Sequence, residues 1–369
     1  MIASVPNVSD IHYPFSAVIG QDKLKMALLL VACDPALGGV LISGHRGTAK
    51  STLARSLADL LHNKPFVNCP LGVSEDRLLG SLDIEHALAT GEVKFSAGLF
   101  AQAHGGVLYV DEINLLPDHL IDLLLDVSAS GINYLERDGI SYQHAAQFIL
   151  IGSMNPEEGA LRSQLLDRFG LSVDIRQNPN LEQRLAIVEA RLAFDADPNE
   201  FIKAYAEQQN TLRQQLYHAN RALKDIKITP ESKLKIAQYC LQAGVEGIRA
   251  DLALLRAARA HTAMRGHDEV EEGDIEAVKA FVLTHRQTEK METDLQQHSY
   301  HFPKNHPATK QTTTQNKSTP PAHTDNGQTV QGDWGEMPVE TVAMGLKRQL
   351  DPKKFTNNQV LSTQKKKIP

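Results

Sequence analysis

The sequence predicts an α/β protein with a parallel sheet, followed by a helical region and a polar tail. Up to about residue 176, short apolar runs alternate with segments whose apolar residues recur at helical spacing. Strands that are apolar at every position are typical of a parallel sheet covered by helices on both faces. The expected strands are Val40–Ser43, Pro65–Asn68, Val107–Val110, Phe148–Gly152 and Leu171–Ile175.

Two segments interrupt this alternation and predict β-hairpins that project from the sheet. The first spans Asp83–Phe100 with Thr90-Gly91 near its centre, and the second spans Gly131–His144 with Asp138-Gly139 near its centre. Asp-Gly favours a tight hairpin turn because both positions tolerate positive φ. Ordinary surface loops are the alternative at both places.

The region from about residue 180 to residue 286 predicts an all-α domain. Thr229 followed by Pro230 and Glu231 is a typical helix start, with a capping hydroxyl, a proline in the first turn and an acid. A further helix is expected over 274–285. Another helix is marked by an apolar stripe at helical spacing, formed by Ile248, Leu252 and Leu255 and followed by Arg259.

From Gln287 onward the chain is polar and rich in Thr, Gln, Asn and Pro, a composition that predicts disorder because too little apolar surface is available for burial. Residues 332–352 differ, since they hold the only tryptophan, Trp334, and several apolar residues. They predict a short docking peptide, and an inert tail is the alternative.

Composition excludes several classes of protein. The chain has 369 residues, which suggests two or three domains, and its net charge of −6 combines −9 before Gln287 with +3 from Gln287 onward. An acidic core is a poor match for the nucleic-acid backbone, so no nucleic-acid partner is expected. We expect no membrane span, no signal peptide and a cytoplasmic location. Cys33, Cys69 and Cys240 form no CxxC pair and predict reduced thiols rather than a zinc site.

A modified phosphate-binding loop follows the first expected strand. The usual pattern is glycine, four residues, then Gly-Lys-Ser/Thr, and alanine replaces the second glycine here. Backbone N–H groups form such a cradle, so we expect Ala49 to be tolerated if its φ stays negative. The candidate phosphate-binding residues are Gly44, His45, Arg46, Gly47, Thr48, Ala49, Lys50, Ser51 and Thr52.

Three polar residues at the ends of later strands support a Mg-ATP site. Asp111 and Glu112 follow the apolar run GGVLYV, and Asn155 follows FILIGSM. In this interpretation, Lys50 contacts the β- and γ-phosphates, while Ser51 and Asp111 hold Mg²⁺, Asp111 through water. Glu112 polarises the attacking water and Asn155 orients it. The sequence therefore predicts ATP and Mg²⁺ as cofactors.

The order of these motifs, followed by a helical lid, resembles an AAA+ ATPase. The segments LYVDEINLLPDHLIDLLLDVSASGINYLERDGIS, MNPEEGALRSQLLDRFGL and GIRADLALLRAARA resemble the I-type ATPase subunit of magnesium chelatase and its relatives in cobalt chelatases. The resemblance covers roughly Tyr13 to Arg286. It implies a nucleotide-binding domain over 1–178 with a five-stranded sheet and two hairpin insertions, a helical lid over 179–290 and a tail over 291–369.

The resemblance also implies roles for residues away from the loop. Val18, Ile19 and Gly20 correspond to the segment that lines the adenine pocket. Arg168 corresponds to an arginine finger that reaches the neighbouring subunit's nucleotide, and Arg249 to the second sensor on the lid. Arg162 is a weaker candidate for a subunit contact. These assignments imply a ring, expected to be a hexamer.

Three departures from the family pattern leave undecided which metal the chelatase inserts. The loop has GTAK where magnesium-chelatase I subunits have GTGK, the stretch between Lys50 and Glu75 is short, and the tail is long. These features resemble the shorter ATPases that accompany cobalt-inserting subunits. The expected partners are a D-like subunit with an adhesion (von Willebrand A-type) domain and a large tetrapyrrole-binding subunit, and the substrate metal is Mg²⁺ or Co²⁺.

Three other functions compete with the chelatase motor. A MoxR-like ATPase that loads a metal cofactor into another enzyme would share the nucleotide motifs. A nucleic-acid motor would need a basic hairpin, whereas this hairpin carries Glu136, Arg137 and Asp138. A D-like scaffold with a dead site would lack Lys50, Glu112 or Arg168, and the chain has all three.

Overall fold

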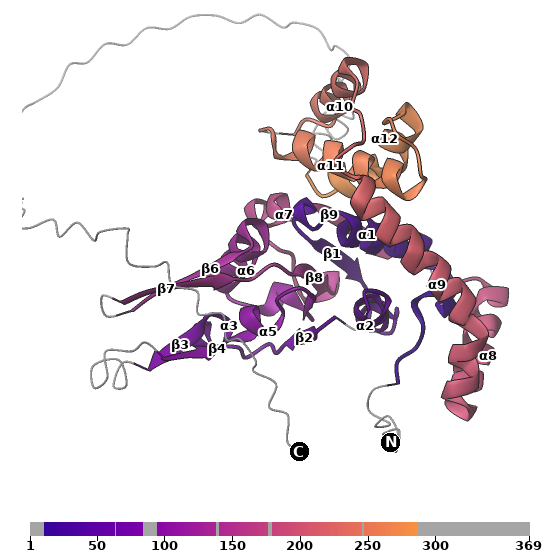
Figure 1. Cartoon of the computed structure of the whole chain (residues 1–369), viewed down its shortest axis with the longest axis horizontal. Helices are drawn as coiled ribbons and strands as arrows, with labels where there is room; N and C mark the ends of the chain where they lie inside the picture. The colour runs from indigo at the N-terminus through magenta and orange to yellow at the C-terminus, as the bar shows by residue number, and fades with distance from the viewer. Residues whose placement is uncertain are drawn as a thin grey trace, which may run out of the picture. The chain divides into compact units, whose positions relative to one another are not determined.

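The computed structural model describes residues 11–62, 64–83, 94–137, 140–175, 179–245 and 247–286 (Figure 1). Within them, the predicted α/β fold is confirmed, since five parallel strands form one sheet in the order β2-β5-β8-β1-β9. The strands are β1 (Val40–Gly44), β2 (Phe66–Cys69), β5 (Val107–Val110), β8 (Ile149–Met154) and β9 (Leu171–Ile175). The predicted tail, with its docking peptide near 332–352, lies outside the described residues.

Both faces of the sheet are buried along its three central strands, β1, β5 and β8, which explains why these strands are mainly apolar. The edge strands β2 and β9 include the exposed residues Asn68 and Asp174. In β1, Val40 and Ile42 enter one core cluster and Leu41 enters the other. Helices α1 (Asp22–Cys33) and α2 (Lys50–Leu60) contribute to the first cluster. The second face is covered by α3 (Glu75–Leu79), α5 (Leu99–Gln102), α6 (Asp118–Ser130) and α7 (Ser163–Arg168).

Antiparallel hairpins are present at both predicted places, although the first begins at Gly80, before the expected segment Asp83–Phe100. Strand β3 (Gly80–Asp83) pairs with β4 (Lys94–Ala97), and β6 (Ile132–Arg137) pairs with β7 (Ile140–Ala145), both antiparallel. The expected turns at 90–91 and 138–139 lie outside the described residues. The hairpins contact each other through stacked rings, because the centroid of Phe95 lies 4.6 Å from that of Tyr142.

The helical region is also confirmed. It consists of α8 (Leu181–Ala196), α9 (Pro198–Ala222), α10 (Pro230–Gln242), α11 (Arg249–Met264) and α12 (Glu272–Leu283). Thr229 caps α10 as predicted, since its side-chain oxygen accepts a hydrogen bond from the N–H of Ser232 at 3.1 Å. Among the described residues, no helix has both the length and the apolar character required to cross a bilayer.

The stripe predicted on α11 is not the face that this helix buries. Ile248 and Leu252 are 73% and 47% exposed, whereas the buried face consists mainly of alanines together with Leu254. Alanines allow α11 to pack closely against α12 and α9. Helical spacing alone identifies two apolar faces on α11, and tertiary packing selects the one with the smaller side chains.

The end of α12 is joined to the chain just before β9 by a buried arginine. The Arg286 side chain is only 3% exposed and pairs with Asp167 at 3.1 Å. It also donates hydrogen bonds to the carbonyl oxygens of Asp167, Phe169 and Gly170. Burial lowers the pKa of Arg286, and the Asp167 carboxylate opposes this shift. The lid therefore holds the segment that contains Arg168.

Candidate nucleotide site

The polar residues predicted from separate motifs meet at one edge of the sheet. Because the strands are parallel and β1, β8 and β5 are neighbours, their carboxyl ends lie side by side. The loop after β1, the acids after β5 and Asn155 after β8 therefore line a common cavity of about 530 Å³. The cavity is lined by Arg46, Gly47, Thr48, Ala49, Lys50, Ser51, Thr52, Tyr109, Asp111, Glu112 and Asn155.

The glycines of the loop are needed for two different reasons. Gly47 has a φ of 80°, a conformation that glycine adopts without strain. At Gly44 the reason is space, because an added Cβ would lie 3.0 Å from the Cβ of Ile175 on the neighbouring strand. The loop backbone thus remains close to β9 and can present its N–H groups to an anion.

The expectation that Ala49 keeps a negative φ is wrong. Ala49 has φ 61° and ψ 22°, in the left-handed region, immediately before α2 begins at Lys50. The left-handed conformation brings Cβ close to the following carbonyl group, at a cost of roughly 1–2 kcal/mol for a residue other than glycine. The chain therefore adopts the loop shape that glycine would favour and tolerates the strain of a methyl group there.

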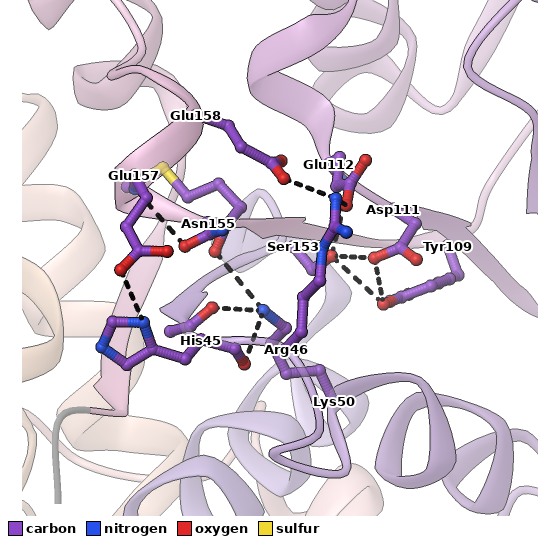
Figure 2. A network of polar contacts seen from close by, with 12 residues as sticks. His45, Arg46, Lys50, Tyr109, Asp111, Glu112, Ser153, Asn155, Glu157 and Glu158 are labelled. Carbon is purple, nitrogen blue, oxygen red and sulfur yellow. Dashed lines mark hydrogen bonds and ion pairs between the residues drawn. The ribbon is translucent and has the colours of Figure 1, made fainter.

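Lys50 lies at the base of the loop with its ammonium group directed back into it. The Nζ atom donates to the carbonyl oxygens of Gly44 at 2.5 Å, His45 at 3.4 Å and Met154 at 3.5 Å (Figure 2). Burial lowers the pKa of Lys50, while Asp111 and Glu112 act in the opposite direction. An ammonium group held mainly by neutral carbonyls can turn toward phosphate oxygens when they are present.

Asp111 is held from one side by two hydroxyl groups. Tyr109 donates to Oδ1 of Asp111 at 3.0 Å, and Ser153 donates to the same oxygen (Figure 2). Burial raises the pKa of Tyr109, so its hydroxyl remains protonated and continues to donate. Both of these bonds end on Oδ1, so neither of them uses Oδ2, which can accept from a ligand such as metal-bound water.

Glu112 is fixed by both its backbone and its side chain. Its φ of 50° is left-handed, and its N–H donates to Oγ of Ser153 at 3.3 Å. Arg46, from the phosphate loop, pairs with Glu112 at 2.9 Å and with Glu158 at 2.5 Å (Figure 2). These two carboxylates raise the pKa of Arg46, and Glu158 has the larger effect. The phosphate loop and the candidate base are therefore linked by a charge pair.

Asn155 is buried at the end of β8 and faces the same cavity. Its side-chain oxygen accepts a hydrogen bond from the N–H of Glu157 at 3.3 Å. This bond directs the amide NH₂ group away from Glu157, where it can donate to a water or a phosphate oxygen.

The predicted adenine-binding segment lies beside a second cavity of about 600 Å³. Ile19 and Gly20 line this cavity together with Ile175, and Val18 is buried behind them. Gly44 pairs in register with Ile175, so the cavity begins next to the phosphate loop. The predicted phosphate-binding and adenine-binding segments therefore border neighbouring cavities.

Arg168 does not lie in this site. It precedes β9 at the amino end of the strand, and β9 runs parallel to β1, so it lies at the sheet edge opposite Lys50. The Arg168 side chain is paired with Asp122 and Asp126 of α6 and is 21% exposed. In a single chain, Arg168 therefore cannot serve the cavity that contains Lys50.

Arg249 lies beside Arg168 rather than beside Lys50. It begins α11 and pairs with Asp167 at 3.2 Å, with a side chain that is 63% exposed. Arg162 is 76% exposed and pairs with Asp118 at 2.6 Å. The lid thus places its candidate sensor on the same edge as the candidate finger, away from the cavity of its own chain.

Sequence reasoning missed Tyr109, Ser153 and Glu158 as members of the site. A signal for the first two was available, since alternate residues of a strand share one face, and Tyr109 and Ser153 lie two residues before Asp111 and Asn155. Glu158 gave no such signal, because its contact with Arg46 depends on how the chain turns after β8.

Comparisons with known proteins agree with this architecture. Residues 39–169 match the family described as AAA domain (dynein-related subfamily), and residues 233–300 match the AAA lid domain. A crystal structure from Cytophaga hutchinsonii shares the fold, with a TM-score of 0.54 at 18% identity over 76% of this chain and 86% of that chain. The fold and the site therefore define an AAA+ ATPase.

Relatives with higher identity narrow the class. Magnesium-chelatase subunit ChlI of Olisthodiscus luteus is 45% identical over 74% of this chain and 90% of that protein. The magnesium-chelatase 38 kDa subunit of Cereibacter sphaeroides is 44% identical over 74% of this chain and 92% of that protein. The chain belongs to this family of magnesium-chelatase I subunits.

Two further matches differ in how much of the matched protein is aligned with this chain. The uncharacterized protein Rv2850c of Mycobacterium tuberculosis is 49% identical over 74% of this chain, and the aligned region spans 44% of that longer protein. A chain from the complex between subunits BchI and BchD of magnesium chelatase is 42% identical over 75% of this chain and 97% of that chain, with a TM-score of 0.46.

Proposed function

We propose that this protein is the ATP-hydrolysing ring motor of a class I metal chelatase. It drives insertion of Mg²⁺ or Co²⁺ into a tetrapyrrole that is held by a separate large subunit. The observation that carries the proposal is the convergence of Lys50, Asp111, Glu112 and Asn155 on one cavity. Membership in the magnesium-chelatase I-subunit family supports the choice of chelatase over other AAA+ functions.

The residues of the cavity fit Mg-ATP. The open loop around Gly47 presents backbone N–H groups to the phosphates, and Lys50 turns from its carbonyl partners to the β- and γ-phosphates. The hydroxyl of Ser51 and, through water, the Oδ2 atom of Asp111 would hold Mg²⁺. Bound there, Mg²⁺ would supply positive charge that neutralises the phosphate oxygens.

Hydrolysis then depends on two residues at the ends of β5 and β8. Glu112 accepts a hydrogen bond from the attacking water and so polarises it. The amide of Asn155 orients the same water. Binding of the γ-phosphate gives Arg46 a new anionic partner and releases Glu112 from its ion pair. In the structure, the ion pair with Arg46 thus neutralises the charge of the candidate base.

Completion of the site requires a second copy of the chain. Arg168 and Arg249 both lie at the sheet edge opposite Lys50. They are neighbours, because Arg249 pairs with Asp167, the residue before Arg168. In a head-to-tail ring, that edge of one subunit faces the cavity edge of the next. Both arginines would then stabilise the charge that develops on the neighbour's γ-phosphate. An arginine finger raises the rate of hydrolysis by roughly 10³-fold or more. The proposed ring is a hexamer.

The two hairpins are the proposed output of the motor. Because the rings of Phe95 and Tyr142 stack, we expect the two hairpins to move as one unit. The proposed partners are a D-like subunit with an adhesion domain and the large tetrapyrrole-binding subunit. No part of the proposal requires nucleic acid or a membrane, and we place the motor in the cytoplasm.

A hydrolysis-deficient variant tests the function. The Glu112→Gln protein is expected to bind Mg-ATP and to hydrolyse it slowly, so that assembled complexes persist. Purified from the native host with Mg-ATP, it should retain a large tetrapyrrole-binding chelatase subunit and an adhesion-domain protein, identified by mass spectrometry. Lys50→Ala, which removes the phosphate contact, is the matched control and should retain neither.

The outcome also decides between functions. Recovery of a tetrapyrrole-binding subunit supports the chelatase, and insertion assays with that subunit then separate Mg²⁺ from Co²⁺. Recovery of an unrelated metalloenzyme with an adhesion-domain protein, and no chelatase subunit, would overturn the proposal in favour of a MoxR-like role.

A further inference from the structure

Arg46, in the phosphate loop, lines the cavity that contains Lys50 and bridges two carboxylates (Figure 2). Its Nη2 atom donates to Oε1 of Glu112 at 2.9 Å and to Oε1 of Glu158 at 2.5 Å. Neither of these bonds uses Nη1 or Nε. Because a guanidinium group carries five N–H donors in a planar fork, Arg46 keeps donors for a further anion while it holds a carboxylate.

The two carboxylates differ in their relation to the cavity. Glu112 lines the cavity and is the candidate base, whereas Glu158 is not one of the residues that line it. The Glu158 side chain is only 23% exposed. Within the described residues, its second oxygen, Oε2, is buried and accepts no hydrogen bond. Glu158 can therefore accept a second N–H of Arg46 without occupying the space of a phosphate group.

The turn that carries Glu158 also carries Asn155. Asn155 directly follows β8, and the 3₁₀ turn η5 (Pro156–Glu158) comes next. The N–H of Glu158 donates to the carbonyl oxygen of Asn155 at 3.0 Å, and the ring of Pro156 fixes the backbone φ between them. After the turn, the carbonyl oxygen of Gly159 accepts a hydrogen bond from the side chain of Asn114 at 3.2 Å. The turn is thus held at both ends, so it gives Glu158 a fixed position.

Arg46 lies at the end of the cavity where the γ-phosphate would be bound. Glu112 is the residue proposed to polarise the attacking water, and that water must lie next to the γ-phosphorus. The Nη2 atom of Arg46, 2.9 Å from the Glu112 carboxylate, is therefore close to the place of the γ-phosphate oxygens. ADP has no group at this place.

We propose that Arg46 is a ligand of the γ-phosphate and that Glu158 is the positioning residue that keeps it there, so that the site distinguishes ATP from ADP. The inference rests on the proposed function, because it requires that the cavity binds Mg-ATP. The γ-phosphate takes the place of Glu112 on the guanidinium group, and Glu158 remains as the second partner. With ADP, Arg46 stays paired with both carboxylates.

Nucleotide binding to the full chain tests the roles of Arg46 and Glu158. Isothermal titration calorimetry with Mg²⁺ compares AMP-PNP, a non-hydrolysable analogue that keeps a γ-phosphate, with ADP. Arg46→Ala and Glu158→Ala are each expected to lower the affinity for AMP-PNP about tenfold or more, because each removes a charge-assisted contact. The affinity for ADP should stay nearly unchanged in both variants, which also reports that the fold is intact.

A double-mutant cycle separates positioning from a structural role. If Glu158 acts through Arg46, Glu158→Ala should cause little further loss of AMP-PNP affinity in a chain that already carries Arg46→Ala. Glu157→Ala is the matched control on the same turn. The Glu157 side chain is 71% exposed and pairs with Nδ1 of His45 at 3.6 Å. This variant keeps the backbone of the turn and should bind both nucleotides as the wild type does.

Three results would overturn the inference. Wild-type affinity for AMP-PNP in Arg46→Ala or Glu158→Ala would show that the pair does not serve the γ-phosphate. Equal losses for AMP-PNP and ADP, or fully additive losses in the double mutant, would show that Glu158 does not act through Arg46. If Lys50→Ala abolishes AMP-PNP binding in the same assay, the nucleotide site stands and only the role of this pair fails. A wild-type chain that binds neither nucleotide would instead refute the proposed function itself.

Discussion

Backbone strain collects around the nucleotide cavity. Among the described residues, the non-glycine residues with positive φ are Gln21, Ala49, His62 and Glu112. Ala49 and Glu112 line the phosphate cavity, and Gln21 lines the adjoining one. Left-handed φ in non-glycine residues persists where the surrounding structure imposes it, which is typical of functional sites. These three residues are therefore held in place by the site rather than by local preference.

Replacing Ala49 with glycine should stabilise the protein. Glycine removes the steric cost of φ 61°, about 1–2 kcal/mol, and adds roughly 0.4–1 kcal/mol of unfolded-state entropy. The net expectation is a gain of about 0.5–1 kcal/mol in the free energy of unfolding, measured by urea denaturation. Ala206→Gly, at an exposed position inside α9, is the matched control and should destabilise by about 1 kcal/mol. Equal losses in both variants would contradict the assigned strain.

At the scale of single elements, the sequence predicted the sheet and the site better than the lid. The five strands could be predicted because their inward positions on both faces are buried, so each strand contains a run of mainly apolar residues. The convergence of Asp111, Glu112 and Asn155 followed from parallel pairing. The buried face of α11 could not be predicted, because Ile248 and Leu252 have the same spacing as the alanines that the helix actually buries. The sign of φ at Ala49 depends on the loop as a whole, which no local pattern encodes.

The junction of α12 with the chain before β9 should make stability depend on pH. Burial, with a further contribution from Arg286, lowers the pKa of His285 to about 3. The unfolded chain therefore binds a proton at His285 as pH falls below about 6.5, while the folded chain does not, so acidification destabilises the fold. Between pH 6.5 and 4.5 the contribution is about 1 kcal/mol per pH unit.

Urea denaturation across this range measures the effect. His285→Gln removes the titrating group and should flatten the dependence of the free energy of unfolding on pH. His218→Gln, on the exposed face of α9, should leave the dependence unchanged. A wild-type slope that persists in His285→Gln would show that other groups cause it.

The same junction should control the candidate finger. Arg286→Met removes the contacts that hold residues 167–170, so Arg168 should lose its position and turnover should fall about ten- to a hundredfold, with nucleotide affinity retained. Arg259→Met breaks a different contact between α11 and the sheet domain, at Asp34, and should have little effect on turnover. In a double-mutant cycle, Arg286→Met should add little to the loss caused by Arg168→Ala. Full additivity of the two losses would contradict a positioning role.

At the scale of the whole molecule, one chain contains every part of the site but not in one place. The cavity with Lys50 lies at the carboxyl edge of the sheet, and Arg168 and Arg249 lie at the amino edge. The sequence predicted these residues individually through the family resemblance. Their separation across the sheet is what the structure adds, and the proposed head-to-tail ring is based on it.

Mixing two inactive variants tests this account most directly. Lys50→Ala lacks the phosphate contact but keeps its arginines, and Arg168→Ala keeps the cavity but lacks the finger. Each alone should show almost no ATP turnover. In an equal mixture, random assembly pairs an intact cavity with an intact finger at about a quarter of the interfaces, so turnover should rise to about that fraction of the wild-type rate. A mixture no more active than its separate components would contradict a site shared between subunits.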